Sequence, residues 1–354
     1  MPDTVLPSSW VVEGGVADDP GRHAGALNGL FALTGRGSER VIHPINDSAV
    51  EAGHAGPAFY CVHSLSGAGG TDFRQLARLM PGVRFYGIQA PPKKMRDQGF
   101  GGSVEAIAEY YADALVRFQP HGHVLLGGWS AGAIIGLEIA QNLRSRGREV
   151  ALFAAIDAAP ENTAAGRRPW HPIYLLQLAA NLPGWVRHEN LTDKTAVMSL
   201  VRRAGQKTMA RVKATFGERN ATTANDHAVE GIIDLARFPA EQRSFMKRLY
   251  RALLEYHAKP YSGDVVVYEA RVKPLLHLPQ LGRVWRRIAP RSVIVPVDGT
   301  HASIMRKAHV PALADDLRAR IARIAAVPVY DVAGRVCSLA EARERRRARA
   351  LVGS

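Results

Sequence analysis

The residues LLGGWSAGA, Leu125 to Ala133, place a single serine among small residues at the end of an apolar run. Gly128, Ser130 and Gly132 fit the pattern G-x-S-x-G, which fixes only three positions and is therefore common by chance. A very tight turn from a strand into a helix needs such neighbours, because side chains larger than a methyl group would collide there. We therefore expect Ser130 to be a nucleophile on such a turn, with an ordinary helix N-cap as the alternative.

Apolar runs and helical patterns alternate on both sides of this turn. Short apolar runs bounded by turn residues predict strands at 58–62, 83–89, 123–128, 150–156, 264–270 and 292–297. Helical spacing of apolar residues predicts helices at 72–80, 103–118 and 133–147 and a last helix from Pro311, and Ser103 is a good N-cap. Because the strands are continuously apolar, the pattern predicts an α/β fold, with a mostly parallel sheet and helices on both faces.

The alternation of strands and helices also sets the expected domain boundaries. Residues 1–54 are rich in Gly, Asp and Pro and read as an N-terminal extension, in which 40–45 adds an edge strand. Residues 55–326 are expected to form the main domain, interrupted at about 160–262 by a helical insertion without a convincing strand. Residues 327–354 predict a hairpin near Ala333 and Gly334, followed by a strongly basic helix that opens with Ser338 and Glu341 at capping-box spacing.

The composition excludes several classes of protein. With 47% hydrophobic and 22% charged residues the chain is typical of soluble globular proteins. No run approaches the roughly 20 apolar residues of a membrane span, and the N-terminus lacks the pattern of a secretory signal. The two cysteines cannot make a disulfide framework, and Cys61 sits in an apolar run that is expected to be core. These features predict a cytoplasmic protein.

The net charge of +14 raises the question of an acidic partner. No recognisable nucleic-acid module accompanies the charge, so we expect no nucleic-acid partner. Attraction to an acidic or phosphorylated protein and a merely solvated basic surface both remain open, for the whole chain and for its basic C-terminal helix.

A nucleophilic serine needs a base, and 13 histidines compete for that role. His301 lies in VPVDGTHASIM, directly after the last strand. Loops at the carboxyl ends of parallel strands share one edge of the sheet, so this loop can reach the Ser130 turn. His63, at the end of the strand at 58–62, is a rival on the same edge, but we expect it to structure its own loop.

The base in turn needs a carboxylate that orients it. Asp157 ends the strand at 150–156, next to the serine strand and on the same edge of the sheet. The position after the strand at 264–270 offers only Glu269 and Arg271, and Asp298 is expected to belong to the turn before His301. Asp157 is therefore the predicted acid.

The negative charge that develops on the substrate oxygen needs hydrogen-bond donors. The segment HSLSGAGG, His63 to Gly70, follows a strand, and its small residues let backbone N–H groups point inward. We expect the N–H groups of Leu65 and Ala131 to be these donors. The chain order Ser, Asp, His, with an oxyanion loop ahead of the serine, is that of an α/β-hydrolase. Neither a metal nor a cofactor is expected at the site.

Six segments resemble, in sequence and in order, the thioesterase domains that end nonribosomal peptide and polyketide synthases. They are PAFYCVHSLSGAGGTDFRQLARLM, FYGIQAP, HVLLGGWSAGAIIGLEIAQNLRSRGREV, LFAAIDAAP, KPYSGDVVVYEARVKP and VPVDGTHASIM, and together they cover about residues 56–325. The acid on the strand directly after the serine strand resembles the chain-releasing members of this family. The resemblance implies a Ser130 nucleophile with Asp157 and His301 as partners, Leu65 and Ala131 as oxyanion donors, and a lid at about 160–262 over an acyl channel.

Three features depart from the family. His63 is not followed by the proline that many members carry, and the N-terminal extension and basic tail have no clear counterpart. No carrier-attachment motif precedes the domain, since INDSAV at 45–50 is a poor match. We therefore expect a chain that acts on a separate carrier protein, or one whose carrier lies upstream in a longer synthase. Lys and Arg outnumber Asp and Glu between 160 and 260, which would favour the approach of an acidic carrier.

Together these expectations describe a serine hydrolase that takes an acyl, peptidyl or polyketide chain from the phosphopantetheine thioester of a carrier protein. Release would follow by hydrolysis, cyclisation or transfer to an amine or alcohol. The alternative is a free-standing carboxylesterase or lipase-like enzyme, for which the same triad would serve. A binding protein on a hydrolase scaffold is a third reading, although such proteins usually lack a member of the triad.

Overall fold

The computed structural model describes residues 41–46, 56–97, 99–160, 238–272, 281–326, 329–330 and 336–337. Three expected features lie wholly or mostly outside these residues: nearly all of the N-terminal extension, residues 161–237 of the insertion expected at about 160–262, and the basic C-terminal helix.

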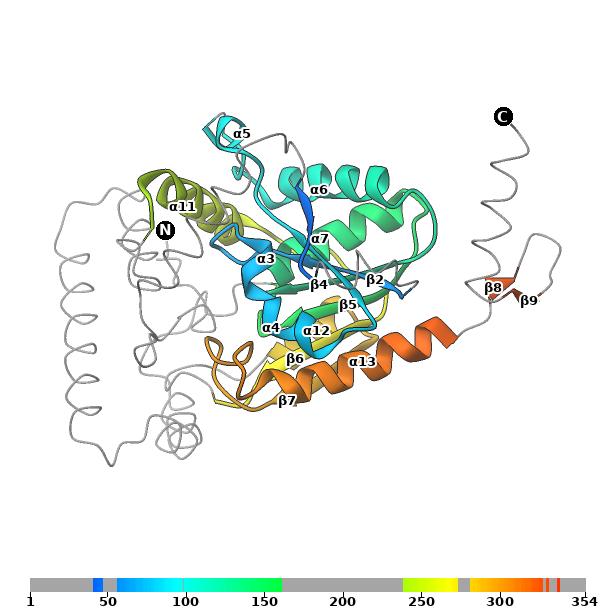
Figure 1. Cartoon of the computed structure of the whole chain (residues 1–354). Coiled ribbons are helices and arrows are strands. Elements are labelled where there is room, and N and C mark those ends of the chain that lie inside the picture. The colour runs from blue at the N-terminus through cyan, green and yellow to red at the C-terminus, as the bar shows by residue number, and fades with distance from the viewer. Residues whose placement is uncertain are drawn as a thin grey trace, which may run out of the picture.

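One seven-stranded sheet forms the centre of the described structure (Figure 1). Its strands are β1 (Ile42–Pro44), β2 (Ala58–Val62), β3 (Arg84–Ile88), β4 (Val124–Trp129), β5 (Val150–Ile156), β6 (Val265–Ala270) and β7 (Ser292–Val297). Their spatial order is β1-β3-β2-β4-β5-β6-β7. Only the edge pair of β1 with β3 is antiparallel, and the other five pairs are parallel. The carboxyl ends of β2 to β7 therefore meet at one edge, where the candidate residues lie.

Helices cover both faces of this sheet, which confirms the predicted α/β architecture. They are α3 (Gly69–Asp72), α4 (Arg74–Leu79), α5 (Lys93–Asp97), α6 (Val104–Phe118), α7 (Ala131–Ser145), α11 (Ala240–Glu255), α12 (Leu281–Ile288) and α13 (Val310–Ala326). Apolar residues of α6, α7, α11 and α12 pack on one face, and those of α4 and α13 on the other. In Figure 1, α6 and α7 accordingly lie above the sheet and α13 lies below it.

The strands feed both cores because successive side chains of a strand point to opposite faces. In β2, Tyr60 and Val62 join the core with α6 and α7, whereas Phe59 and Cys61 join the core with α4 and α13. Cys61 is fully buried, as its apolar run predicts. The continuous apolar pattern of the central strands is thus the direct consequence of burial on two sides.

The described elements agree closely with those predicted, with two exceptions. The helix expected at 72–80 is divided at Phe73 into α3 and α4, and the helices α5 and α12 were not predicted at all. The buried residues Leu281, Val284, Trp285 and Ile288 stand at helical spacing, so the sequence carried a signal for α12. At the place of the predicted hairpin, the two short strands β8 (Val329–Tyr330) and β9 (Val336–Cys337) pair antiparallel.

Candidate active site

Ser130 lies at the junction between β4 and α7, where the chain turns sharply. Its backbone angles, φ 57° and ψ −125°, are rare for residues other than glycine. The turn is held from both sides, because the Ser130 N–H donates to the Ile156 carbonyl (3.1 Å) and the Ser130 carbonyl accepts from the Ala133 N–H (3.0 Å). Although the residue stands at the N-cap position of α7, its side chain makes no capping hydrogen bond. The Ser130 hydroxyl is therefore not used to cap α7 and is available for another interaction.

Gly128 and Gly132 make this turn possible because a side chain at either position would meet backbone atoms. A Cβ on Gly128 would lie 2.0 Å from the Gly132 carbonyl oxygen. A Cβ on Gly132 would lie 2.3 Å from the carbonyl oxygen of Val62 and 2.7 Å from that of His63. The serine turn thus lies directly against the end of β2, and only glycine fits at the contact.

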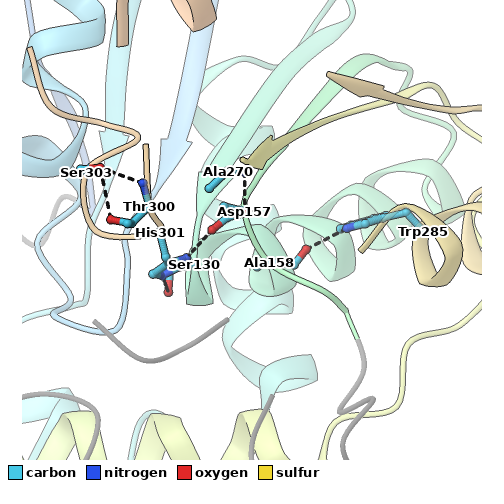
Figure 2. Close-up of polar contacts among 8 residues, drawn as sticks. All are labelled: Ser130, Asp157, Ala158, Ala270, Trp285, Thr300, His301 and Ser303. Carbon is cyan, nitrogen blue, oxygen red and sulfur yellow. Dashed lines mark hydrogen bonds and ion pairs between the residues drawn. The ribbon is translucent and has the colours of Figure 1, made fainter. Parts of the chain in front are cut away.

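The loops after three strands bring Ser130, His301 and Asp157 into one hydrogen-bonded row (Figure 2). His301 Nε2 lies 3.1 Å from Ser130 Oγ, and His301 Nδ1 lies 2.9 Å from Asp157 Oδ2. Because a carboxylate can only accept, Nδ1–H donates to Asp157, and Nε2 is left to accept from the serine hydroxyl. All three side chains are buried. This geometry suits removal of the serine proton by the histidine.

Asp157 is fixed by the ends of two neighbouring elements. Its φ is 46°, its N–H donates to the Tyr268 carbonyl (2.8 Å), and its Oδ1 accepts from the Ala270 N–H (2.8 Å). The next residue, Ala158, accepts a hydrogen bond from the indole Nε1–H of Trp285 in α12 (2.8 Å). Figure 2 shows the bond of Ala270 with Asp157 and that of Trp285 with Ala158. The acid is thus held at both its side chain and its backbone.

His301 is held by a compact turn and by an aromatic neighbour. The Thr300 N–H donates to Ser303 Oγ (2.8 Å), while the Thr300 carbonyl accepts from the N–H groups of Ser303 and Ile304 (3.0 and 2.9 Å). The indole of Trp129 stacks on the imidazole, with ring centroids 5.5 Å apart and planes at 29°. A stacked indole favours a cationic ring, so this contact would stabilise the imidazolium that forms when His301 takes a proton.

Leu65 and Ala131, the expected oxyanion donors, lie in the loop after β2 and at the start of α7. The turn that contains Leu65 is closed by the Gly67 N–H, which donates to the Ser64 carbonyl (3.1 Å). Ala131 is the first residue of its helix, so its N–H has no acceptor within the helix. The two residues belong to segments that meet at the glycine contact described above, and their role as donors remains a prediction.

His63 is occupied by its own loop. Its Nδ1–H donates to the Ser64 carbonyl (2.6 Å) and its Nε2 accepts from the Tyr111 hydroxyl (2.7 Å). Burial lowers the pKa of His63 to about 4, so the ring is neutral at neutral pH. The structure agrees with the expectation that His63 structures the loop.

The other acids considered from the sequence lie elsewhere. Asp298 pairs with Arg271 (3.0 Å), and its side chain is 80% exposed. At the end of β6 it is the backbone N–H of Ala270 that contacts the Asp157 carboxylate. No side chain after β6 is therefore needed to explain how the acid is held.

Sequence reasoning did not identify three residues that surround the row: Trp129, Ala270 and Trp285. Trp129 occupies a position that the serine motif leaves open, and Ala270 contributes only its backbone. Neither residue therefore carries a signal in the sequence. Trp285 could have been found only through the helical spacing of α12.

The described residues do not meet the requirements of two other kinds of site. They contain no group of three or more His, Cys, Asp or Glu side chains placed to hold a metal ion. Among their helices, none combines the length and apolar character that a membrane crossing requires.

Comparison with known proteins connects this site with one family. The chain matches the family described as "Thioesterase domain" over residues 57–321. It is 34% identical over 107 residues to microperfuranone synthase of Emericella nidulans, which is 30% of this chain and 11% of that protein. It is 33% identical over 109 residues to enterobactin synthase component F of Escherichia coli K12, which is 30% of this chain and 8% of that protein. The chain therefore matches only a small part of these relatives.

A solved structure shows the same fold. The four-domain nonribosomal peptide synthetase AB3403, bound to AMP and glycine, aligns with a TM-score of 0.53 and 19% identity. The alignment covers 85% of this chain and 21% of that chain. At this identity the likeness supports the α/β-hydrolase fold and carries no information about substrate.

Proposed function

Since the chain belongs to the thioesterase domain family, we propose that it releases an acyl, peptidyl or polyketide chain from the phosphopantetheine thioester of a carrier protein. Ser130 would take up the chain as an ester, and water, an internal hydroxyl, or an amine or alcohol would then remove it. The relatives named as synthases support the class of substrate.

One observation carries this proposal: Ser130 Oγ lies 3.1 Å from His301 Nε2, and His301 Nδ1 lies 2.9 Å from the buried Asp157. A serine hydroxyl is a weak nucleophile on its own and needs a base within hydrogen-bond distance. The carboxylate fixes the tautomer of the imidazole and stabilises the cation that forms. Each part of that requirement is met by a described atom.

The reaction follows from these contacts. Ser130 Oγ attacks the thioester carbonyl carbon while its proton passes to His301 Nε2. The carbon–sulfur bond then breaks, and the imidazolium returns the proton to the departing thiol of the phosphopantetheine arm. In the second half, His301 takes a proton from the incoming water, hydroxyl or amine and delivers it to Ser130 Oγ as the ester bond breaks. The serine is thereby restored.

The tetrahedral intermediates of both halves carry negative charge on the former carbonyl oxygen. We assign the N–H groups of Leu65 and Ala131 to this oxygen, because they come from the two segments that meet beside Ser130. Removing one such donor in other hydrolases lowers kcat by roughly 10²–10³. The positive end of α7 would add to this stabilisation.

The charge of the chain supports a carrier protein as partner. The net charge is +14, and basic residues outnumber acidic ones between 160 and 260. Opposite charge raises the rate of encounter, and salt screens this effect. Turnover of a chain loaded on an acidic carrier protein should therefore fall between 50 mM and 500 mM salt, whereas turnover of the same chain on pantetheine alone should not. Equal salt dependence of both substrates would contradict the partner and leave the chemistry standing.

The experiment that tests the proposed function is intact-protein mass spectrometry after incubation with acyl-pantetheine thioesters. Wild type should gain the mass of the acyl group, and Ser130→Ala should not. His301→Ala should form the adduct far more slowly. Ser145→Ala, which alters an exposed serine far along α7, is the matched control and should behave as wild type.

The outcomes separate the candidate functions. An adduct that persists in Ser130→Ala would contradict the assigned nucleophile. Hydrolysis of simple oxygen esters without an adduct or turnover from any thioester would indicate the free-standing esterase instead. The product released from the adduct identifies the acceptor as water, an internal group or an amine.

A further inference from the structure

The loop from His63 to Ala68, which carries Leu65, has a compact internal structure. In addition to the Gly67 to Ser64 bond that closes its turn, Ser66 Oγ accepts from the Ala68 N–H and lies within hydrogen-bond distance of Ser64 Oγ, both at 3.2 Å. Leu65 and Ser66 are therefore the two central residues of the turn. The orientation of the Leu65 N–H depends on how this turn sits against its surroundings.

Contacts with α3, with α6 and with the segment after β3 hold the two ends of the loop. At the first end, the Ser64 N–H donates to Asp72 Oδ2 (3.3 Å), and the His63 ring is held by Tyr111. At the other end, the Gly67 carbonyl accepts from the Ala90 N–H (2.9 Å). These bonds fix where the loop starts and ends but do not reach its tip.

The tip is contacted by α11. Gln242, near the start of this helix, is 2% exposed, and its Nε2 donates to the Ser66 carbonyl (2.8 Å). One turn later, the fully buried Phe245 lies over the loop: a Cβ on Gly67 would be 3.0 Å from its ring, and the ring meets His63 edge-on at a centroid distance of 6.0 Å. The contact joins residues that are 176 positions apart in the sequence.

α11 is itself firmly anchored, so it can act as a support. The Arg248 guanidinium donates to the carbonyl oxygens of Arg96 and Phe100. Just past the C-terminal end of the helix, the Tyr256 hydroxyl donates to the buried Glu138 carboxylate of α7 (2.7 Å). The helix is thus tied to the same element that begins at the serine turn.

We propose that Gln242 is a positioning residue for the oxyanion hole: its hydrogen bond to Ser66 sets the turn that aims the Leu65 N–H at the reacting carbonyl. This inference rests on the proposed function, because it assumes that Leu65 is an oxyanion donor. It adds that α11, which falls within the insertion expected at about 160–262, takes part in catalysis. A donor displaced by part of an ångström stabilises the transition state less, while the ground-state substrate binds nearly as before.

Gln242→Met tests this with little risk of unfolding. Methionine has nearly the length and volume of glutamine and no N–H group. Within the described residues, the Gln242 Oε1 is buried without a hydrogen-bond partner. The substitution therefore removes this unsatisfied acceptor together with the hydrogen bond from Nε2 to the Ser66 carbonyl. The two changes offset each other in the free energy of unfolding. The variant is intended to change only the turn at Ser66, whose carbonyl loses its hydrogen bond with residue 242.

Gln141→Met is the matched control. Gln141 lies on α7, its Nε2 also donates to a backbone carbonyl, that of Lys259 (2.7 Å), and its Oε1 is likewise buried without a partner in the described structure. The bond ties down the chain after α11 but does not touch the oxyanion loop. A purely structural effect of losing such a bond should appear equally in both variants.

The measurements are kcat and KM for a p-nitrophenyl ester and for an acyl-pantetheine thioester, and the inhibition constant of an alkylboronic acid, which forms a tetrahedral adduct on an active serine. We expect Gln242→Met to lower kcat about tenfold for both substrates. KM should stay within about twofold, and boronate affinity should fall by the same factor as kcat. Gln141→Met should leave all three values within about twofold of wild type.

The results distinguish this inference from the proposed function. Equal effects of the two variants, or a reduced kcat with unchanged boronate affinity, would overturn the role of Gln242 while leaving the Ser130 chemistry intact. A wild-type protein that forms no adduct with ester, thioester or boronate would contradict the proposed function, and the role of Gln242 with it. Melting temperatures of both variants identify any loss that comes from unfolding.

Discussion

Ser130 keeps a backbone conformation that costs a residue about 1–3 kcal/mol, and the close approach of two glycines makes that conformation possible. The strain serves to lift the hydroxyl out of the helix and toward His301. At the residue scale, the absence of side chains at Gly128 and Gly132 is therefore as necessary to the site as the side chains of Ser130, His301 and Asp157.

Gly132→Ala tests this close approach. The added Cβ would lie 2.3 Å from the Val62 carbonyl oxygen, so the β2 end and the serine turn must separate. We expect the free energy of unfolding to fall by about 3 kcal/mol and acylation of Ser130 to slow at least tenfold. Gly70→Ala is the control, because a Cβ there meets nothing within 4 Å. Denaturant unfolding checks stability, and similar losses in both variants would contradict the explanation.

Trp129 should contribute to the rate through its stacking on His301. Removing the indole withdraws a favourable contact with the imidazolium, worth about 0.5–2 kcal/mol. Trp129→Leu should slow single-turnover acylation by about threefold to thirtyfold, and Trp129→Phe should fall between it and wild type. Stopped-flow acylation with a p-nitrophenyl ester measures this order. If Trp129→Phe were as slow as Trp129→Leu, stacking of an aromatic ring on His301 would not explain the contribution of Trp129 to the acylation rate.

At the scale of elements, α12 links the core to the acid of the site. Its indole donor Trp285 is fully buried and bonds the carbonyl of Ala158, one residue after Asp157. The same loop leads to residue 160, where the expected insertion begins. A short helix that the alternation of strands and helices did not predict therefore helps to position the carboxylate.

Trp285→Phe keeps an aromatic ring and removes the N–H. The Ala158 carbonyl would be left buried and unpaired, which costs about 1–3 kcal/mol. We expect that loss in the free energy of unfolding and a several-fold lower kcat, since Asp157 would be held less firmly. Urea unfolding and steady-state kinetics measure the two effects. Full stability with normal kcat would contradict the role of this bond.

At the scale of the whole molecule, the parallel sheet places the loops after β2, β4, β5 and β7 at one edge. The same compactness fully buries His63 and half-buries Asp72 beside the loop that carries Leu65. Burial lowers the pKa of His63 to about 4, and desolvation raises the pKa of Asp72 to about 6 despite its hydrogen bonds with Ser64. The two groups affect the pH dependence of stability in opposite directions.

Below pH 6.5 the unfolded chain protonates His63 and the folded protein does not, so stability is lost as the pH falls from 6.5 to 4. For Asp72 the folded protein takes the proton first, so stability is gained as the pH falls from about 6 to 3.8. In wild type these contributions oppose each other. His63→Gln should therefore be less destabilised by acid than wild type, and Asp72→Asn more so.

Urea unfolding of the three proteins at pH 7, 5.5 and 4.5 measures this prediction. Each variant replaces a single titrating side chain, so the difference between its curve and that of wild type is assigned to that residue. Parallel curves for wild type and both variants would show that neither group is perturbed in the folded protein.

The fold was predictable because its signals are local and repeated. Continuous apolar runs such as Val150–Ile156 indicate strands buried on both faces, and Ser103 at the start of α6 caps it through the Ala106 N–H as expected. The serine motif between a strand and a helix indicated the turn at Ser130. Chain order and the shared edge of a parallel sheet then selected His301 and Asp157 from many candidates, and the structure brings these two residues to Ser130.

Contacts between distant segments could not be predicted in this way. Three contacts are examples: the Gln242 bond to Ser66, the Trp129 stack on His301 and the bond from the Ala270 N–H to Asp157. Each joins residues from different elements, and the last uses only the backbone of Ala270. The local sequence pattern reveals helices and strands, because each turn of a helix and each pleat of a strand must place apolar side chains on its buried face. Which side chain meets which carbonyl depends on the relative placement of whole elements, and that placement is decided only when the tertiary structure forms.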